Sequence, residues 1–166
     1  MKRLLVILLC LILCGCKQIG EEKIDMDQKY LSIIDSINDH ENFATSSKYF
    51  DVQCEMAKIN DGYRFYVTID NPTLAMYDIQ AMAIEKGVDY SKVMAASVGV
   101  VEDTKYAMIP NQANPDEGFY QGITISGIAS IPLTTLYVYV NFKNGDGSNS
   151  YTEFMIFDVA YGAIYE

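Results

Sequence analysis

The chain has 166 residues, half of them hydrophobic, and its 22 acidic and 12 basic side chains give a formal charge of -10 at neutral pH. A surface of this sign repels phosphate backbones, which argues against nucleic acid as a partner. The length suffices for one domain with its own hydrophobic core, rather than two.

The amino-terminal segment has the pattern of a secretory signal. Lys2 and Arg3 precede an unbroken apolar run from Leu4 to Cys14. This run has about eleven residues, whereas a helix needs about 20 to cross the hydrocarbon layer of a bilayer. We therefore expect an export signal and not a permanent membrane span.

The apolar run ends in Leu13-Cys14-Gly15-Cys16. This sequence resembles a lipobox, the processing motif of bacterial lipoproteins. The resemblance implies that a diacylglycerol is attached to Cys16 through a thioether and that the signal peptide, residues 1–15, is then removed. Residues 16–26, which are mostly polar and charged, are expected to form a lipidated tether.

The lipid on Cys16 determines the expected location. Each buried methylene contributes about 0.8 kcal/mol, so two or three acyl chains hold a small domain at a bilayer almost permanently. We expect a protein that is lipid-anchored to the extracellular face of the cell membrane. Its content of Ile, Tyr, Asn and Lys favours a Gram-positive source; in a Gram-negative cell it would face the periplasm.

The domain is expected to span residues 27–166 and to begin with an amphipathic helix. From Asp27 to about Asp39 the apolar side chains recur at three- and four-residue spacing, which places them on one stripe of a helix. This stripe needs a partner surface, either the rest of the domain or another protein of an envelope complex. Its residues are Tyr30, Ile33, Ile34 and Ile37.

After Phe50 the hydrophobic periodicity becomes that of strands and stays so to the end of the chain. Asn60-Asp61-Gly62 supplies the left-handed backbone of a tight hairpin. The run Leu74–Lys86 is rich in Ala, Met and Glu, which favour helices, but we expect a strand within it. The predicted strands are Phe50–Ile59, Tyr63–Asp70, Met76–Glu85, Val93–Glu102, Phe119–Ile128, Leu136–Lys143 and Tyr151–Val159.

Seven strands separated by turn signals and preceded by one helix predict two antiparallel sheets packed face to face. The predicted fold is therefore mainly β, a single antiparallel immunoglobulin-like β-sandwich behind an amino-terminal amphipathic helix, with an open barrel as the alternative geometry. In broad pattern the domain resembles the immunoglobulin-like ectodomains of many Gram-positive lipoproteins. It lacks the buried tryptophan and the disulfide of antibody domains, since it has no Trp.

Few residues offer catalytic or metal-binding chemistry. Once Cys16 carries lipid, Cys54 has no disulfide partner, and its place in an alternating strand predicts a buried structural thiol. His40 is the only histidine and should interact with the dipole at the carboxyl end of the helix. With no second histidine, nucleophile elbow or phosphate-binding loop, we expect no catalytic residue, metal site or cofactor. The oxygen-rich loop Asn111–Glu117 fits a plain surface turn.

The most unusual feature of the composition is 13 tyrosines. Because side chains alternate along a strand, Tyr137 and Tyr139 should point away from the core, and so should Tyr66. Together they would form an amphipathic surface suited to stacking on sugars or docking peptides. Alternatively, the helix at residues 27–39 covers this face and buries the rings.

These observations predict a non-enzymatic binding or accessory module that is tethered at the cell surface and recognises a protein, a peptide or a wall glycan. One alternative is a structural or assembly subunit of an envelope complex, which would dock through the apolar stripe of the helix at residues 27–39. The other is a hydrolase that uses carboxylates from separate loops.

Overall fold

The computed structural model describes residues 18–90, 92–145 and 147–163, with side chains from residue 28 onward. The predicted signal peptide and Cys16 lie outside these residues. No helix in the described part of the chain is both long and apolar enough to span a bilayer. The elements are α2 (Gln18–Asn38), β1 (Asp51–Ile59), β2 (Gly62–Asp70), β3 (Met76–Glu85), β4 (Ala96–Val98), the 3₁₀ helix η1 (Pro115–Glu117), β5 (Gly122–Ala129), β6 (Leu133–Asn144) and β7 (Ser150–Ala160).

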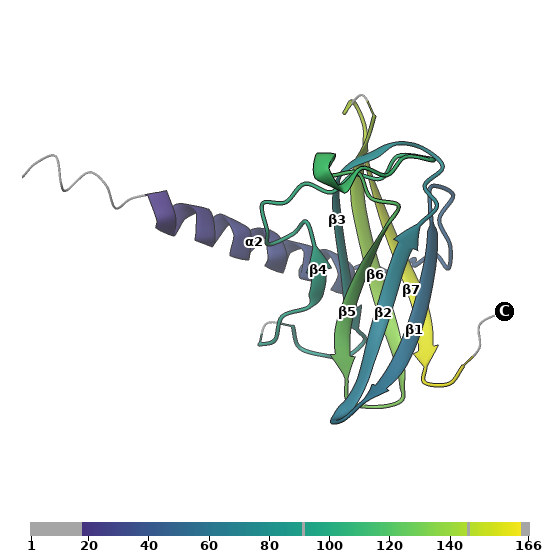
Figure 1. The fold of residues 1–166 in the computed structure, drawn as a ribbon. Helices are drawn as coiled ribbons and strands as arrows, with labels where there is room; N and C mark the ends of the chain where they lie inside the picture. Colours follow the sequence, from purple (N-terminus) through teal and green to yellow (C-terminus); the bar gives the residue numbers. More distant parts are fainter. Residues whose placement is uncertain (1–17, 91, 146, 164–166) are drawn as a thin grey trace, which may run out of the picture.

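The strands form two antiparallel sheets that pack face to face (Figure 1). One sheet has the order β1-β2-β5 and the other the order β4-β3-β6-β7. The prediction of a mainly β fold with seven strands, two antiparallel sheets and one helix is therefore confirmed. The finer assignment to an immunoglobulin-like topology stays a prediction.

The main core lies between the two sheets, because alternate residues of each strand point inward. Phe65, Val67 and Ile69 on β2 and Val138, Val140 and Phe142 on β6 are all nearly inaccessible to solvent. Burial of one such side chain contributes about 1.5–3 kcal/mol. Gly127 is required in this core: it pairs with Phe65, and a Cβ there would lie 2.3 Å from the Phe65 ring.

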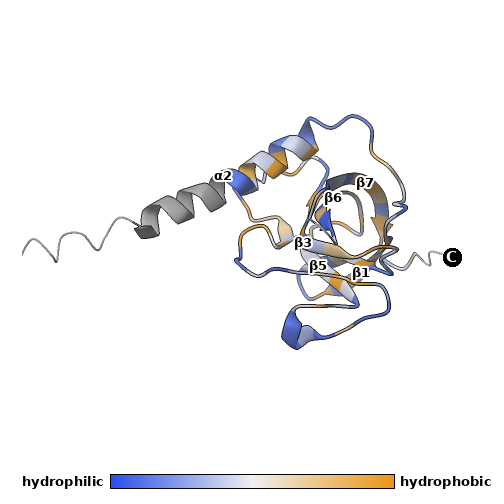
Figure 2. Cartoon of the chain, turned by 90° about the horizontal axis from the view of Figure 1, so that it is seen from above, coloured by the Kyte–Doolittle hydropathy of each residue, from blue (hydrophilic) through white to orange (hydrophobic). Residues whose placement is uncertain are grey.

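A second, smaller core joins α2 to the outer face of the four-stranded sheet. The stripe Tyr30, Ile33, Ile34 and Ile37 is buried against Met82 and Ile84 of β3 and Tyr139 of β6. The Tyr30 hydroxyl also accepts a hydrogen bond of 2.8 Å from the backbone N–H of Ala95. Figure 2 shows α2 on the opposite side of the four-stranded sheet from β1 and β5. The domain itself is thus the partner of the apolar stripe.

Two elements differ most from their predicted bounds, whereas β5 and β6 differ by up to three residues at their ends. The helix begins at Gln18 rather than Asp27, so most of the segment expected as a tether is helical. Strand β4 has only three residues, where Val93–Glu102 was predicted. The chain turns at Gly99, whose φ of +67° brings it so close to β3 that a Cβ would lie 2.1 Å from the carbonyl oxygen of Ile79. This approach ends the strand.

Candidate functional site

The outer face of the four-stranded sheet is largely covered. Tyr139 is 8% exposed beneath α2, and burial raises the pKa of its hydroxyl. Tyr137 stacks on Phe43, with 4.3 Å between the ring centroids. His40 stacks on Phe154 of β7 at 4.0 Å. The helix and the segment that follows it therefore cover both tyrosines of β6.

Tyr66 lies on the other sheet, opposite Glu55 of β1 and Ser126 of β5. The surface that Tyr66, Tyr137 and Tyr139 were predicted to share is therefore not formed. The alternative prediction, that the helix covers the tyrosines, describes Tyr137 and Tyr139 but not Tyr66. The reason is that strand alternation tells which residues leave the core but not which sheet a strand joins.

Within the described part of the chain, no α-helix lies over the outer face of the three-stranded sheet, called the open face below (Figure 1). Its central column on β2 is Arg64, Tyr66, Thr68 and Asp70, all half-buried. The hydroxyls of Thr68 and Thr124 on β5 share a hydrogen bond of 2.9 Å. The open face is thus a surface of hydroxyl, amide and charged groups around one tyrosine ring, with the exposed side chain of Ile128 on β5 opposite Arg64.

A hollow of about 780 Å³ lies at one end of the open face, where β2 ends and β5 begins. The chain around residues 109–112 forms its other wall. Asn71 and Asn111 at its rim have left-handed backbones, with φ of 48° and 60°, a conformation that asparagine tolerates better than most residues. The lining residues are Thr68, Asp70, Asn71, Pro72, Ile109, Pro110, Asn111, Gln112, Gln121, Gly122 and Thr124.

Asp70 is the one charged side chain in this lining. Its Oδ1 atom is buried and has no hydrogen-bond partner among the described residues. Burial and the neighbouring charge of Asp51, its cross-strand partner on β1, raise the pKa of the Asp70 carboxyl. Asp51 is held by the side chain of Asn71, whose Nδ2 donates to Asp51 Oδ2 at 3.1 Å. The carboxyl group at the wall of the hollow therefore has one oxygen, Oδ1, whose hydrogen-bonding capacity is unsatisfied.

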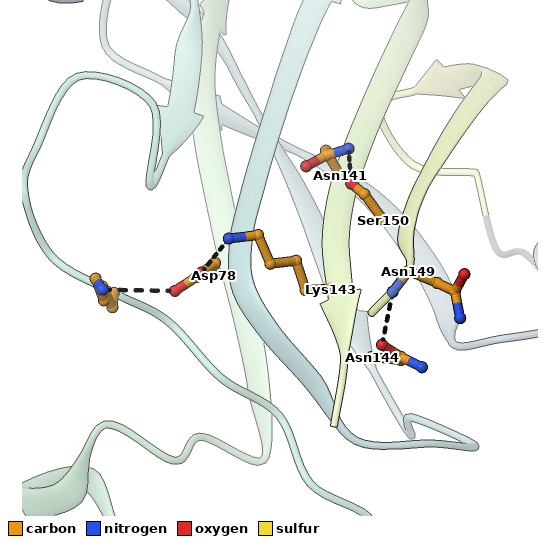
Figure 3. Close-up of polar contacts among 7 residues, drawn as sticks. Asp78, Asn141, Lys143, Asn144, Asn149 and Ser150 are labelled. Atoms are coloured by element: carbon orange, nitrogen blue, oxygen red, sulfur yellow. Dashed lines mark hydrogen bonds and ion pairs between the residues drawn. The ribbon is translucent and has the colours of Figure 1, made fainter. Parts of the chain in front are cut away.

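A second polar hollow, of about 300 Å³, lies beside β3 and β6 and is lined in part by Lys29, Asp78, Lys105 and Lys143. Asp78 sits at an irregularity of the β3–β6 register with a φ of 49°. Its carboxylate accepts a hydrogen bond of 2.9 Å from Lys143 Nζ (Figure 3) and lies 4.0 Å from Lys105 Nζ. The pKa of Asp78 is lowered, mainly by the hydrogen bond from Lys143. The acid in this hollow already has its partners.

The same close-up shows how the β6–β7 loop is held (Figure 3). Asn144 Oδ1 accepts a hydrogen bond of 3.1 Å from the backbone N–H of Asn149. Asn141 donates to Ser150 Oγ at 3.2 Å and to Thr152 Oγ1 at 2.8 Å. These amides close the hairpin and have a structural role.

The third hollow, of about 840 Å³, lies between the edge strands β1 and β7 and is lined by Cys54, Met56 and Phe157 among others. Burial raises the pKa of the Cys54 thiol to about 12. At neutral pH the thiol is therefore protonated and a poor nucleophile. Among the described residues no three His, Cys, Asp or Glu side chains are grouped closely enough to hold a metal ion.

Sequence reasoning missed the hollow at Asp70, although part of its signal was available. The hairpin turn at residues 60–62 fixes the register of β1 and β2 and so places Asp51 opposite Asp70. Two like charges directly opposite one another on adjacent strands are unfavourable, so this pairing was a signal that the sequence offered. The position of Asn111 and Gln112 beside β2 could not be predicted, because nothing local in the sequence indicates that this loop packs there.

Comparisons with known proteins assign no family. No family model matches the chain, and no curated protein matches it. Among solved structures, the chain is similar to one described as the X-ray structure of Northeast Structural Genomics Consortium target SoR45, with 15% identity and a TM-score of 0.43 over 74% of this chain and 94% of that one. A similarity of this size carries no implication for function.

Proposed function

We propose that the protein is a lipid-anchored lipoprotein of the cell surface that acts as a non-enzymatic binding module, with the open face as its ligand surface. The observation that carries the proposal is the difference between the two outer faces. One is buried under α2, whereas the other keeps Tyr66 and a row of hydrogen-bonding groups uncovered and ends in a hollow. The ligand is a protein, a peptide or a wall glycan.

The anchoring half of the proposal is supported by the lipobox at residues 13–16. A thioether-linked lipid on Cys16 holds the domain next to a bilayer without a membrane-spanning helix. The test is to compare the wild type with Cys16→Ser in fractionated cells of the source organism, and to determine the mass of the amino-terminal peptide. A Cys16→Ser protein that stays in the membrane fraction would contradict this half.

The binding half is tested with tyrosine substitutions and isolated cell envelopes. Retention of the Tyr66→Ala protein by envelopes should fall at least about fivefold, because aromatic residues dominate such contacts. Tyr161→Ala is the matched control, since Tyr161 is an exposed tyrosine that lines the hollow between β1 and β7. Equal retention of both variants would show that the open face is not the ligand surface.

The structure does not favour docking through the helix stripe, because Ile37 is 1% exposed and its neighbours on the stripe are buried as well. One observation favours a hydrolase as a second candidate. Asp70, whose pKa is raised, faces Asp51 across the hairpin, and a carboxyl with a raised pKa beside a second carboxyl is an arrangement used in acid catalysis. Turnover in a screen of envelope polysaccharides and peptides, lost in Asp70→Asn, would replace the binding proposal.

A further inference from the structure

The hollow at the end of the open face has the dimensions of a small-ligand site. Its volume of about 780 Å³ lies within the range of roughly 300–1,000 Å³ that such sites occupy. Its walls come from β2, β5 and the chain around residues 109–112. Three segments distant in sequence thus contribute to one concave surface.

The lining has the chemistry of a site for hydroxyl groups. The side-chain amides of Asn111, Gln112 and Gln121 and the hydroxyl of Thr124 are exposed around it. Amides and hydroxyls both donate and accept, as do the hydroxyls of a sugar ring. Pro72, Ile109 and Pro110 add apolar surface against which the C–H groups of a ring can pack. A binding site that combines apolar walls with a few directed polar groups has this composition.

Asp70 supplies a charged acceptor for a hydrogen-bond donor of the ligand. The half-buried carboxylate of Asp70 lines the hollow, and its buried Oδ1 has no partner in the described part of the chain. A ligand hydroxyl that reaches this carboxylate from the hollow donates to it in a charge-assisted hydrogen bond. None of the described residues that line the hollow has a cationic side chain, and Asp51 adds a second negative charge next to Asp70. An anionic ligand would therefore be repelled, and the carboxylate of a peptide terminus finds no counter-ion.

We infer that this hollow binds a neutral saccharide, with the carboxylate of Asp70 as the acceptor for a ligand hydroxyl. The inference rests on the proposed function and names the ligand class of the open face. Tyr66 lies two residues from Thr68 on the same side of β2, so their side chains are separated by about 7 Å along the strand. A chain of sugar units bound in the hollow extends from there onto the Tyr66 ring.

The test measures binding of defined oligosaccharides to the full-length protein in detergent. The probes are neutral oligomers of glucose, xylose, mannose and N-acetylglucosamine; a polyanionic glycan and a set of unstructured peptides complete the panel. At least one neutral oligomer should bind, and the polyanion should not. Asp70→Ala should weaken that binding at least tenfold and Asp70→Asn by less, because an amide oxygen is a weaker acceptor than a carboxylate.

Asp61→Asn is the matched control, since Asp61 is an exposed acid at the opposite end of the same hairpin. Its affinity should equal that of the wild type. Affinity of the wild type should also fall as the pH is lowered through the pKa of Asp70, whereas Asp70→Asn should show no such fall. Among the residues that the structure describes, Asp51 is the one other charged group that faces Asp70, because the walls from β5 and residues 109–112 contain no charged side chain.

The possible outcomes distinguish failure of the saccharide inference from failure of the proposed binding function. One outcome is that no saccharide binds, but a peptide does, and that Tyr66→Ala abolishes the peptide binding. The saccharide inference is then wrong, whereas the proposed binding module stands. If a neutral oligomer binds equally well to wild type and Asp70→Ala, the site is wrong. If nothing in the panel or in cell envelopes binds in a way that Tyr66→Ala changes, both are wrong.

Discussion

The two outer faces of the sandwich both follow from the alternation of side chains along strands, but one face is covered and the other is not. On each sheet, alternate side chains point away from the main core, but these outward side chains differ in polarity between the two sheets. On the four-stranded sheet they include Met82, Ile84 and Phe154, and these apolar groups pack beneath α2 or the segment after it. On the three-stranded sheet they include Thr68 and Thr124, which satisfy one another and need no cover. Covering a face is therefore driven by its apolar area.

The comparison also holds within the four-stranded sheet. The cross-strand row of Met82, Tyr139 and Phe154 is apolar, whereas the next row contains Gln80, Asn141 and Thr152. The second core ends where this change occurs, since Met82 and Tyr139 are buried whereas Gln80 and Asn141 are half-buried and Thr152 is exposed. The composition of each row thus decides how far the cover extends.

The sharpest test of the covered face is Ile37→Ala. Ile37 is 1% exposed, so removing its side chain beyond Cβ should lower the free energy of unfolding by about 3 kcal/mol. Leu31→Ala is the matched control on the same helix, because Leu31 is 44% exposed; its effect should be within about 0.5 kcal/mol. Urea unfolding measures both. Similar losses in the two variants would mean that α2 is not docked as described.

A pair of tyrosine substitutions compares the two faces directly. Tyr139→Ala should lower the free energy of unfolding by about 2–3 kcal/mol, because the ring is buried under α2. Tyr66→Ala should lower it by less than about 1 kcal/mol, because the open face has no second core. Urea titration gives both values. The reverse order would show that the sheets have exchanged their covered and open sides.

The acids Asp70 and Asp78 should give pH effects of opposite sign. The pKa of Asp70 is raised, so its ionised form costs stability above that pKa, and the cost disappears as the pH falls through it. The pKa of Asp78 is lowered, so its ionised form adds stability above the ordinary Asp pKa, and this is lost as the pH falls through the lowered value. At neutral pH Asp70→Asn should stabilise and Asp78→Asn should destabilise, each by about 0.5 kcal/mol after solvent screening. The free energy of unfolding as a function of pH measures both slopes, and slopes of equal sign would contradict the assignment.

The smallest expected effect is at Cys54. With a pKa of about 12, the native thiol should not react measurably with an alkylating reagent at neutral pH, whereas the unfolded chain should react. Mass spectrometry after timed labelling gives the comparison. Rapid native labelling would place Cys54 in solvent, outside the edge between β1 and β7.

The fold could be predicted where local signals decide it. Asn60-Asp61-Gly62 predicts the β1–β2 hairpin, and the bounds of β3 match the predicted strand despite its helical propensity. The short length of β4 could not be predicted, since it depends on the contact between Gly99 and the Ile79 carbonyl group. The distribution of the tyrosines could not be predicted either, because membership of a sheet depends on pairing between distant strands.

The candidate site shows the same division between local and distant information. Strand alternation places Tyr66, Thr68 and Asp70 on one face from sequence alone. That this face stays uncovered depends on where α2 docks, and that it ends in a hollow depends on the chain around residues 109–112. Both are decided by contacts between residues far apart in the sequence.

The early start of α2 has a mechanical consequence. The helix begins at Gln18, two positions after the proposed lipid attachment at Cys16, and a helix rises about 1.5 Å per residue, so Gln18 to Lys29 spans roughly 17 Å. A continuous helix transmits orientation, which a flexible linker does not. A helix that starts this close to the anchor would then restrict the orientation of the domain relative to the membrane. The open face would lie on the side of the domain opposite α2.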